Sequence, residues 1–245
     1  MTNQAKLYKR VSTGQHKCGL ELINMAQIHP NDFVLDIGSG TGNLTFELAK
    51  QVQPNGRVYA IEPDMERMKV AKQETPNDIN NIVWHEGALD SFLPTKKPMF
   101  NVAYSNYVFH WIKEQKLAVQ NVYDNLLEGG RFAFCCAFGM SQVIRDLCEA
   151  IGKEGEEITS ALHFTPKNKW LEYFEQAGFK IKIINAVPDY EFQDIDEVMT
   201  WWEATTHGKF SISKLGVQAQ EKLRKIYPGD IIIYQNQILR LLAEK

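Results

Sequence analysis

One segment near the N-terminus constrains the fold more than any other. A short, largely apolar run at residues 34–37 leads into the turn G-S-G-T-G, and an amphipathic helical pattern over residues 44–50 follows. A buried strand, a tight glycine turn and a helix N-terminus together form the first half of a nucleotide-type binding unit. Glycine suits such a turn because the backbone adopts unusual dihedral angles and approaches a ligand closely. The segment therefore predicts an α/β fold with a ligand site at the turn.

The spacing around this turn narrows the class of ligand. The pattern is D-x-G-x-G-x-G from Asp36 to Gly42, whereas the dinucleotide fingerprint is G-x-G-x-x-G and would need glycine in place of Asn43. A second apolar run, residues 58–61, ends in Glu62, which lies 20 residues after Gly42. A carboxylate at that position accepts hydrogen bonds from ribose hydroxyls and disfavours a 2′-phosphate. A glycine turn by itself fits an ordinary loop, but the strand, Asp36, the helix and Glu62 together favour a nucleoside-containing ligand.

Further along, short apolar runs alternate with helical patterns, which indicates a parallel sheet covered by helices on both faces. We expect one domain over residues 1–245: a helical cap at about 1–30, a ligand-binding core at 31–140, and a C-terminal sheet hairpin with a helical lid at 141–245. Residues 231–234 and 237–242 are expected to form a final, interrupted strand at the sheet edge. The predicted strands are residues 34–37, 58–61, 82–86, 100–105, 131–138 and 179–184, and the predicted helices are residues 8–28, 44–50, 65–72, 114–127, 167–176 and an insertion at 195–227.

The glycine turn resembles motif I of the class I S-adenosylmethionine (SAM) dependent methyltransferases. That resemblance implies a Rossmann-like, doubly wound sheet of seven mostly parallel strands whose last strand is antiparallel. It implies SAM as cofactor, with Asp36 near the ammonium group, Glu62 on the ribose and residues 87–89 beside the adenine. The alternative role for Asp36 is to cap neighbouring backbone amides, and both roles could hold at the same time. The implied cofactor-binding residues are Asp36, Gly38, Ser39, Gly40, Gly42, Glu62, Pro63, Gly87, Ala88, Leu89 and Ser105.

The segment after the fourth predicted strand, S-N-Y-V-F-H-W, points to the methyl acceptor. It lacks the prolines of DNA and protein-glutamine N-methyltransferases and resembles the S-x-x-x-x-H-W pattern of small-molecule methyltransferases, especially trans-aconitate and juvenile hormone acid methyltransferases. In the latter family a Leu-Tyr pair precedes a glutamine, as Leu7 and Tyr8 precede Gln15 here. The resemblance implies that Gln15 and Trp111 present two N–H donors to a substrate carboxylate, with His110 beside them. The plain alternative for Gln15 is a solvated position on a helix.

We therefore expect a SAM-dependent methyltransferase of small molecules, most consistent with O-methylation of a carboxylic acid. A carboxylate needs no general base, since it is ionised at neutral pH. A phenol or alcohol would need one, for which His110 or His163 are candidates. The alternatives are methylation of another small amine or phenol, a non-catalytic SAM-binding partner, and an NAD oxidoreductase. Two adjacent tryptophans on the predicted lid helix, Trp201 and Trp202, should not share a face, so at most one is expected in the acceptor pocket.

Composition excludes several other classes of protein. The net charge of −3 and the pI of about 6.1 give no basic field for nucleic acid or an acidic membrane surface. No apolar run approaches the ~18 residues of a membrane span, and the N-terminus lacks an apolar signal region. We therefore expect a cytoplasmic protein with a small-molecule partner and neither nucleic acid nor membrane. The spacing of the four cysteines fits neither a metal site nor a disulfide framework. They are Cys18, Cys135, Cys136 and Cys148.

Overall fold

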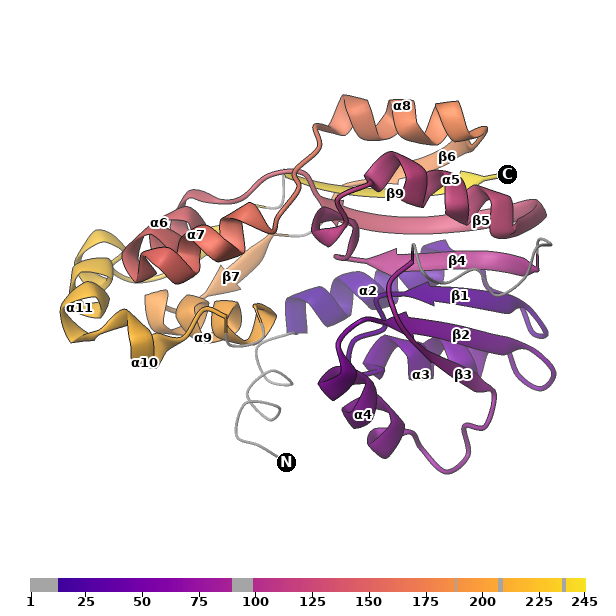
Figure 1. The fold of residues 1–245 in the computed structure, drawn as a ribbon, viewed down its shortest axis with the longest axis horizontal. Coiled ribbons are helices and arrows are strands. Elements are labelled where there is room, and N and C mark those ends of the chain that lie inside the picture. The colour runs from indigo at the N-terminus through magenta and orange to yellow at the C-terminus, as the bar shows by residue number, and fades with distance from the viewer. Residues whose placement is uncertain (1–12, 90–98, 188, 207–208, 235–236) are drawn as a thin grey trace.

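The computed structural model describes residues 13–89, 99–187, 189–206, 209–234 and 237–245. A seven-stranded sheet with strand order β3-β2-β1-β4-β5-β9-β6 forms the main body, and a helical cap lies at one end of it (Figure 1). Strands β1 to β5 are parallel, and β9 pairs antiparallel with both β5 and β6. The predicted seven-stranded sheet with an antiparallel last strand is confirmed. The strands of this sheet are β1 (Phe33–Ile37), β2 (Arg57–Glu62), β3 (Ile82–Glu86), β4 (Phe100–Asn106), β5 (Leu126–Ala137), β6 (Lys180–Asn185) and β9 (Ile238–Glu244).

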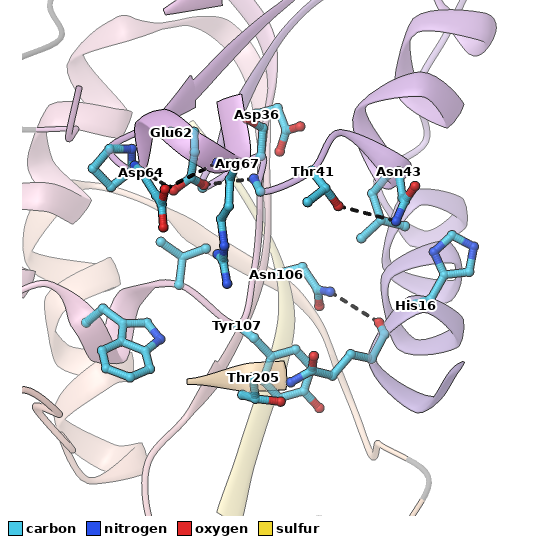
Figure 2. Close-up of a pocket in the computed structure, with 18 of the residues that line it drawn as sticks. His16, Asp36, Thr41, Asn43, Glu62, Asp64, Arg67, Asn106, Tyr107 and Thr205 are labelled. Atoms are coloured by element: carbon cyan, nitrogen blue, oxygen red, sulfur yellow. Dashed lines mark hydrogen bonds between the residues drawn. The ribbon is translucent and has the colours of Figure 1, made fainter. Parts of the chain in front are cut away.

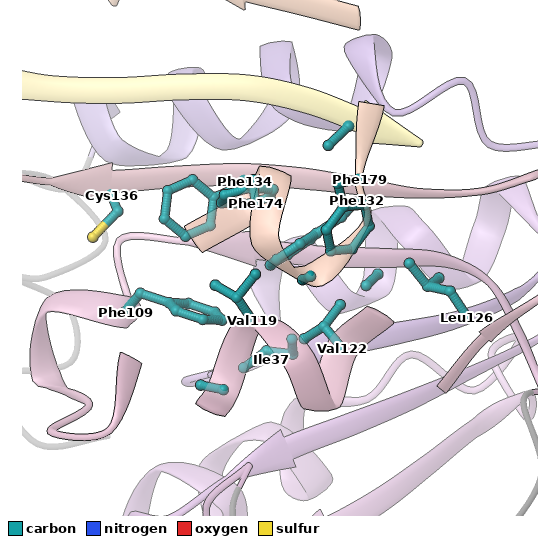
Figure 3. Packing of buried hydrophobic residues seen from close by; sticks show 14 of the residues in the cluster. Ile37, Phe109, Val119, Val122, Leu126, Phe132, Phe134, Cys136, Phe174 and Phe179 are labelled. Carbon is teal, nitrogen blue, oxygen red and sulfur yellow. The ribbon is translucent and has the colours of Figure 1, made fainter. Parts of the chain in front are cut away.

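Helices cover both faces of the sheet, and each face has its own apolar core. One core joins the sheet to α5 and α8, and the other joins it to α2 and α3. Side chains alternate between the faces: on β5, Phe132 and Phe134 enter the first core, whereas Ala133 and Cys135 enter the second. Figure 3 shows how aromatic rings dominate the first core. The covering helices and the helix that follows β2 are α2 (Thr13–Met25), α3 (Asn43–Gln51), α4 (Met65–Glu74), α5 (Gln115–Asn125) and α8 (Lys167–Ala177).

The C-terminal strand departs from the sequence prediction. Strand β9 lies between β5 and β6 and not at the sheet edge, and β8 (Ile231–Ile233) leaves the sheet to pair with β7 (Tyr190–Phe192). The physical reason is burial, since five consecutive residues of β9 are buried, as an interior strand requires. Strand β6 carries Lys180 and Lys182 and is largely exposed, which suits an edge strand that must resist further pairing.

The cap has a hydrophobic core of its own. Trp201, Trp202 and Phe210 are buried in it, together with Ile231 and Ile233 of β8. The described part of the predicted insertion at residues 195–227 is mainly helical and forms part of this cap. Its other members come from the chain between β5 and α8 and from the small β7–β8 sheet. The cap helices are α6 (Gln142–Ile151), α7 (Lys153–Ser160), α9 (Ile195–Thr205), α10 (Ile212–Leu215) and α11 (Val217–Ile226).

The four cysteines are free and buried. Cys18 and Cys135 bring α2 and β5 together, with their Sγ atoms 3.8 Å apart. Within the described ranges, no helix is both long and apolar enough to cross a membrane. Nor does the described part of the chain bring three or more His, Cys, Asp or Glu side chains together in a way that could hold a metal ion.

Candidate active site

The glycine turn after β1 leaves space for a ligand. Gly38, Gly40 and Gly42 have φ angles of 73°, 58° and 85°, which glycine adopts far more readily than other residues. A Cβ atom added at Gly38 would overlap the side chain of Val108, and one added at Gly42 would lie 2.9 Å from the Phe46 ring. A Cβ at Gly40 would meet no described atom within 4 Å. The outer glycines are therefore required for packing, and Gly40 faces open space.

Glu62 ties this turn to the turn after β2. Its side chain is only 3% exposed, and its two carboxylate oxygens accept hydrogen bonds from backbone amides on opposite sides. Oε2 accepts from Gly40 N at 2.8 Å, and Oε1 accepts from Asp64 N at 3.0 Å (Figure 2). An ionised carboxylate has about four acceptor positions, so capacity remains for hydroxyl donors of a ligand.

Asp36 is a second buried carboxyl group in the same cavity. It is 2% exposed, and Thr45 Oγ1 donates a hydrogen bond to its Oδ2 at 2.6 Å. Burial raises the pKa of Asp36 to about 7; the Thr45 hydrogen bond opposes this shift, and the nearby Glu62 charge adds to it. A cation bound beside Asp36 should therefore lower this pKa and favour the ionised carboxylate.

The raised pKa of Asp36 predicts a pH-dependent stability of the ligand-free protein. The unfolded chain ionises Asp36 near its ordinary pKa of 3.8 and the folded chain only near 7, so the cost of the buried charge appears between these pH values. This destabilisation by the buried charge is absent below about pH 3.8 and complete above pH 7. Asp36→Asn should therefore raise the free energy of unfolding by about 1–3 kcal/mol at pH 8 and by clearly less at pH 5. Urea unfolding at both pH values measures this, and an equal effect at the two would contradict the raised pKa.

The chain after β4 forms the opposite wall of the cavity. Tyr107 has φ 59°, an unusual conformation for a bulky residue that often marks a functional site. Its backbone N–H donates to Cys135 O at 2.8 Å, and its hydroxyl accepts from Tyr190 Oη at 2.9 Å. Asn106 donates to Gln15 O at 3.3 Å, which joins α2 to this wall. The strained backbone at Tyr107 therefore stands where the sheet, α2 and the cap meet.

His110 lies in a short 3-10 helix, Phe109–Trp111, directly after this wall. It is 8% exposed, and burial lowers its pKa to about 4, so its imidazole is neutral at physiological pH. Its Nδ1 lies 3.6 Å from Cys136 Sγ, and its ring stacks on Phe164 at a centroid distance of 6.3 Å. Gln115 fixes the 3-10 helix by donating to Phe109 O at 3.0 Å and to the carbonyl of His163 at 2.6 Å. His110 is thus a rigid, uncharged group.

These elements enclose two adjoining cavities of about 340 and 100 Å³. The larger one follows the glycine turn, Glu62 and the wall after β4, as Figure 2 shows. The smaller one extends between the sheet and the cap. Five residues line both cavities and so mark their junction: Gln15, Tyr107, His110, Trp111 and Thr205.

The larger cavity brings together many of the residues that the sequence singled out. Those that line it are Gln15, Asp36, Gly38, Ser39, Gly40, Glu62, Pro63, His110 and Trp111. Gly42, Gly87, Ala88, Leu89 and Ser105 lie outside its lining. Gly87 N donates to Glu62 O at 3.1 Å, whereas Leu89 and Ser105 are buried. Leu7 and Tyr8, which precede Gln15 in the predicted acceptor pattern, lie outside the described residues.

Other residues of the lining were missed from the sequence. Arg67, Asn106, Tyr107, Thr205 and Lys209 also line the larger cavity. Asn106 and Tyr107 belong to the S-N-Y-V-F-H-W segment, so their position after a central strand was a usable signal. Lys209 follows the lid helix and had no such signal. Its Nζ lies 6.0 Å from the centre of the Trp111 ring, which places a cation near the junction of the two cavities.

The expectation for the paired tryptophans was wrong. Trp201 and Trp202 both line the smaller cavity. Neighbouring helical residues project about 100° apart, so a cavity that extends around α9 reaches both. Their ring centroids are 5.8 Å apart, and they contribute to one apolar wall.

The comparison with known families identifies the class. Residues 28–178, more than half of the chain, match the methyltransferase domain model Methyltransf_31. The chain therefore belongs to this methyltransferase family. It is 29% identical over 195 residues to an uncharacterized methyltransferase of Schizosaccharomyces pombe, covering 75% of this chain and 72% of that protein. It is 24% identical over 222 residues to malonyl-[acyl-carrier protein] O-methyltransferase 1 of Ilyobacter polytropus, covering 86% of this chain and 80% of that protein.

Solved structures share the fold. A SAM-dependent methyltransferase from Mesorhizobium loti aligns with a TM-score of 0.58 and 15% identity, covering 92% of this chain and 96% of that one. Geranyl diphosphate methyltransferase in complex with SAM aligns with a TM-score of 0.59 and 12% identity, covering 94% of this chain and 84% of that one.

The protein is a SAM-dependent methyltransferase, and SAM is its cofactor. The cavity fits this molecule chemically. It offers two buried carboxylates for hydroxyl and ammonium groups, open space at Gly40, and a buried Ser39 hydroxyl with no hydrogen-bond partner among the described residues.

Proposed function

We propose that the enzyme transfers the methyl group of SAM to a carboxylate oxygen of a small organic acid. In this proposal Glu62 accepts the ribose hydroxyls, and ionised Asp36 stabilises the ammonium group of the cofactor. When bound, SAM supplies a methyl group already activated on a sulfonium. The protein then has to align the acceptor oxygen with that methyl group and keep water away.

The observation that carries the proposal is the chemistry where the two cavities meet. Gln15 and Trp111 line both cavities there, and their amide and indole N–H groups are neutral donors. Lys209 adds a positive charge beside the Trp111 ring. Two N–H donors and a nearby cation suit a carboxylate, because each of them interacts favourably with negative oxygen. An ammonium acceptor would meet the Lys209 charge unfavourably.

The state of His110 supports the same acceptor. An effective general base has a pKa near the working pH, whereas burial lowers the pKa of His110 to about 4. It is therefore a weak base for a phenol, whose pKa is about 10, but a carboxylic acid with a pKa of about 4 has already lost its proton. The named activity of the Ilyobacter relative, O-methylation of malonyl-[acyl-carrier protein], agrees with this type of acceptor.

A pH profile tests the proposal. With SAM and an acid both saturating, kcat should change less than about twofold between about pH 6.5 and 9, because no group has to remove a proton from the acceptor. The ratio kcat/KM for SAM should fall below pH 7, as Asp36 becomes protonated in the free enzyme. A kcat that rises about tenfold per pH unit would instead indicate a catalytic base and overturn the carboxylate assignment.

A further inference from the structure

The smaller cavity begins at the junction and continues away from the cofactor side. Its volume is about 100 Å³, and its wall is built mainly from the cap and from the chain after β5. An acceptor whose reacting oxygen lies at Gln15 and Trp111 would extend the rest of its structure into this space, because both residues line the two cavities. The side chains of this wall would therefore contact the part of the acceptor that does not react.

The wall of the smaller cavity is mainly apolar, although Ser141, Thr205 and Gln237 also line it. Met140, Ile144, Leu162 and Phe164 contribute to it together with the two tryptophans of α9. Among the described residues that line it there is no Asp, Glu, Lys or Arg, and its histidine, His110, is neutral at physiological pH. A second carboxylate placed here would lose its hydration and gain no opposite charge, which is costly.

The size of the cavity limits what it can hold. A cavity of about 150 Å³ lined by apolar residues binds benzene, so a space of about 100 Å³ admits a compact branched group or part of a ring. Filling it releases apolar surface from water on both partners, which favours binding.

We propose that the smaller cavity selects monocarboxylic acids that carry a compact apolar group and rejects di- and tricarboxylic acids. This inference rests on the proposed carboxylate methylation and adds the substrate class. The acid group lies at Gln15 and Trp111, and the apolar group lies against the cap. The polyacid class that the sequence left open, represented by trans-aconitate-like acids, is thereby disfavoured.

A matched pair of acids provides the test. Both 4-methylpentanoate and succinate contain a carboxylate followed by two methylene groups. At the other end 4-methylpentanoate carries an isopropyl group, whereas succinate carries a second carboxylate. Wild-type enzyme should show a kcat/KM at least about 100-fold higher for 4-methylpentanoate, since both the apolar contact and the cost of burying a charge act in the same direction. Equal values for the two acids would overturn the inference.

Met140→Lys provides the second arm, because Met140 is partly buried in the chain between β5 and α6 and lines the cavity. A lysine there should reduce the preference for 4-methylpentanoate at least about tenfold, since it offers a charge partner to succinate and disrupts the apolar wall. Met65→Lys is the matched control: Met65 is 63% exposed on α4 and lines neither cavity, so the preference should stay unchanged. SAM affinity, measured by calorimetry, shows whether each variant is folded.

The amine 4-methylpentan-1-amine separates the inference from the proposed function. Methylation of this amine but not of the acid, with the same sensitivity to Met140→Lys, would retain the apolar cavity and refute the carboxylate acceptor. Methylation of acids irrespective of their apolar group, with no response to Met140→Lys, would retain the carboxylate acceptor and refute the cavity.

Discussion

Replacing Glu62 by alanine should weaken SAM binding at least about 100-fold, because hydrogen bonds to a charged group contribute about 1.5–3 kcal/mol each and several are lost together. In the free protein the Glu62 carboxylate accepts from Gly40 N and Asp64 N, so the variant also releases the glycine turn from the turn after β2. Calorimetry with SAM and with S-adenosylhomocysteine measures the loss. Both ligands should be affected, since both carry the ribose.

The variant Glu66→Ala, four residues further along the chain, provides a matched control. Glu66 is exposed on α4 and lines neither cavity, so Glu66→Ala removes the same type of side chain without touching the site. Its SAM affinity should remain within about twofold of wild type, as is usual for exposed positions away from structural features. Unchanged SAM affinity in Glu62→Ala itself would remove Glu62 from the cofactor site.

Substitutions at Gln15 and Trp111 should impair the acceptor half of the reaction. Trp111→Phe keeps an aromatic ring and removes the indole N–H, and Gln15→Met keeps the chain length and removes the amide. Each should lower kcat/KM for the acid about 10- to 100-fold, the expected cost of losing one donor to a carboxylate. The double variant should fall below either single variant, because the two donors are proposed to bind the same group.

SAM affinity distinguishes this role from general damage to the fold. Both residues lie at the junction of the cavities, whereas Glu62 and Gly40 line the larger cavity alone, so calorimetric SAM binding should change less than about threefold. Equal losses of SAM affinity and of acceptor turnover would mean that these residues support the structure and do not contact the acceptor.

The cofactor half of the fold could be predicted from the sequence because its signals are local. The glycine turn, Asp36 and Glu62 each have a fixed position relative to a strand end, and parallel strands bring their carboxyl ends to one edge. The structure accordingly places Asp36, Gly40 and Glu62 around one cavity. The predicted adenine-side segment, residues 87–89, lies outside the lining, since a rule based on strand order locates a loop without giving the direction of its side chains.

The acceptor half depends on long-range packing and was harder to read. Residues 231–234 look like a sheet strand by composition, yet Ile231 and Ile233 are buried in the cap, because β8 pairs with β7. Lys209 lies near the Trp111 ring, a contact between segments 98 positions apart in the sequence that no local pattern could indicate. Helical periodicity also predicted that at most one of Trp201 and Trp202 enters the pocket, yet both line the smaller cavity. Periodicity describes the faces of a helix and not the shape of the cavity beside it.

The most direct test of the account follows a labelled methyl group from SAM to 4-methylpentanoate, with 4-methylpentan-1-ol and 4-methylpentan-1-amine as acceptors of matched shape. Label is expected only in the product of the acid, from which mild alkali should release it as methanol, as it does from a methyl ester. Label in the alcohol or amine product alone, stable to alkali, would contradict the carboxylate acceptor while leaving the SAM site intact.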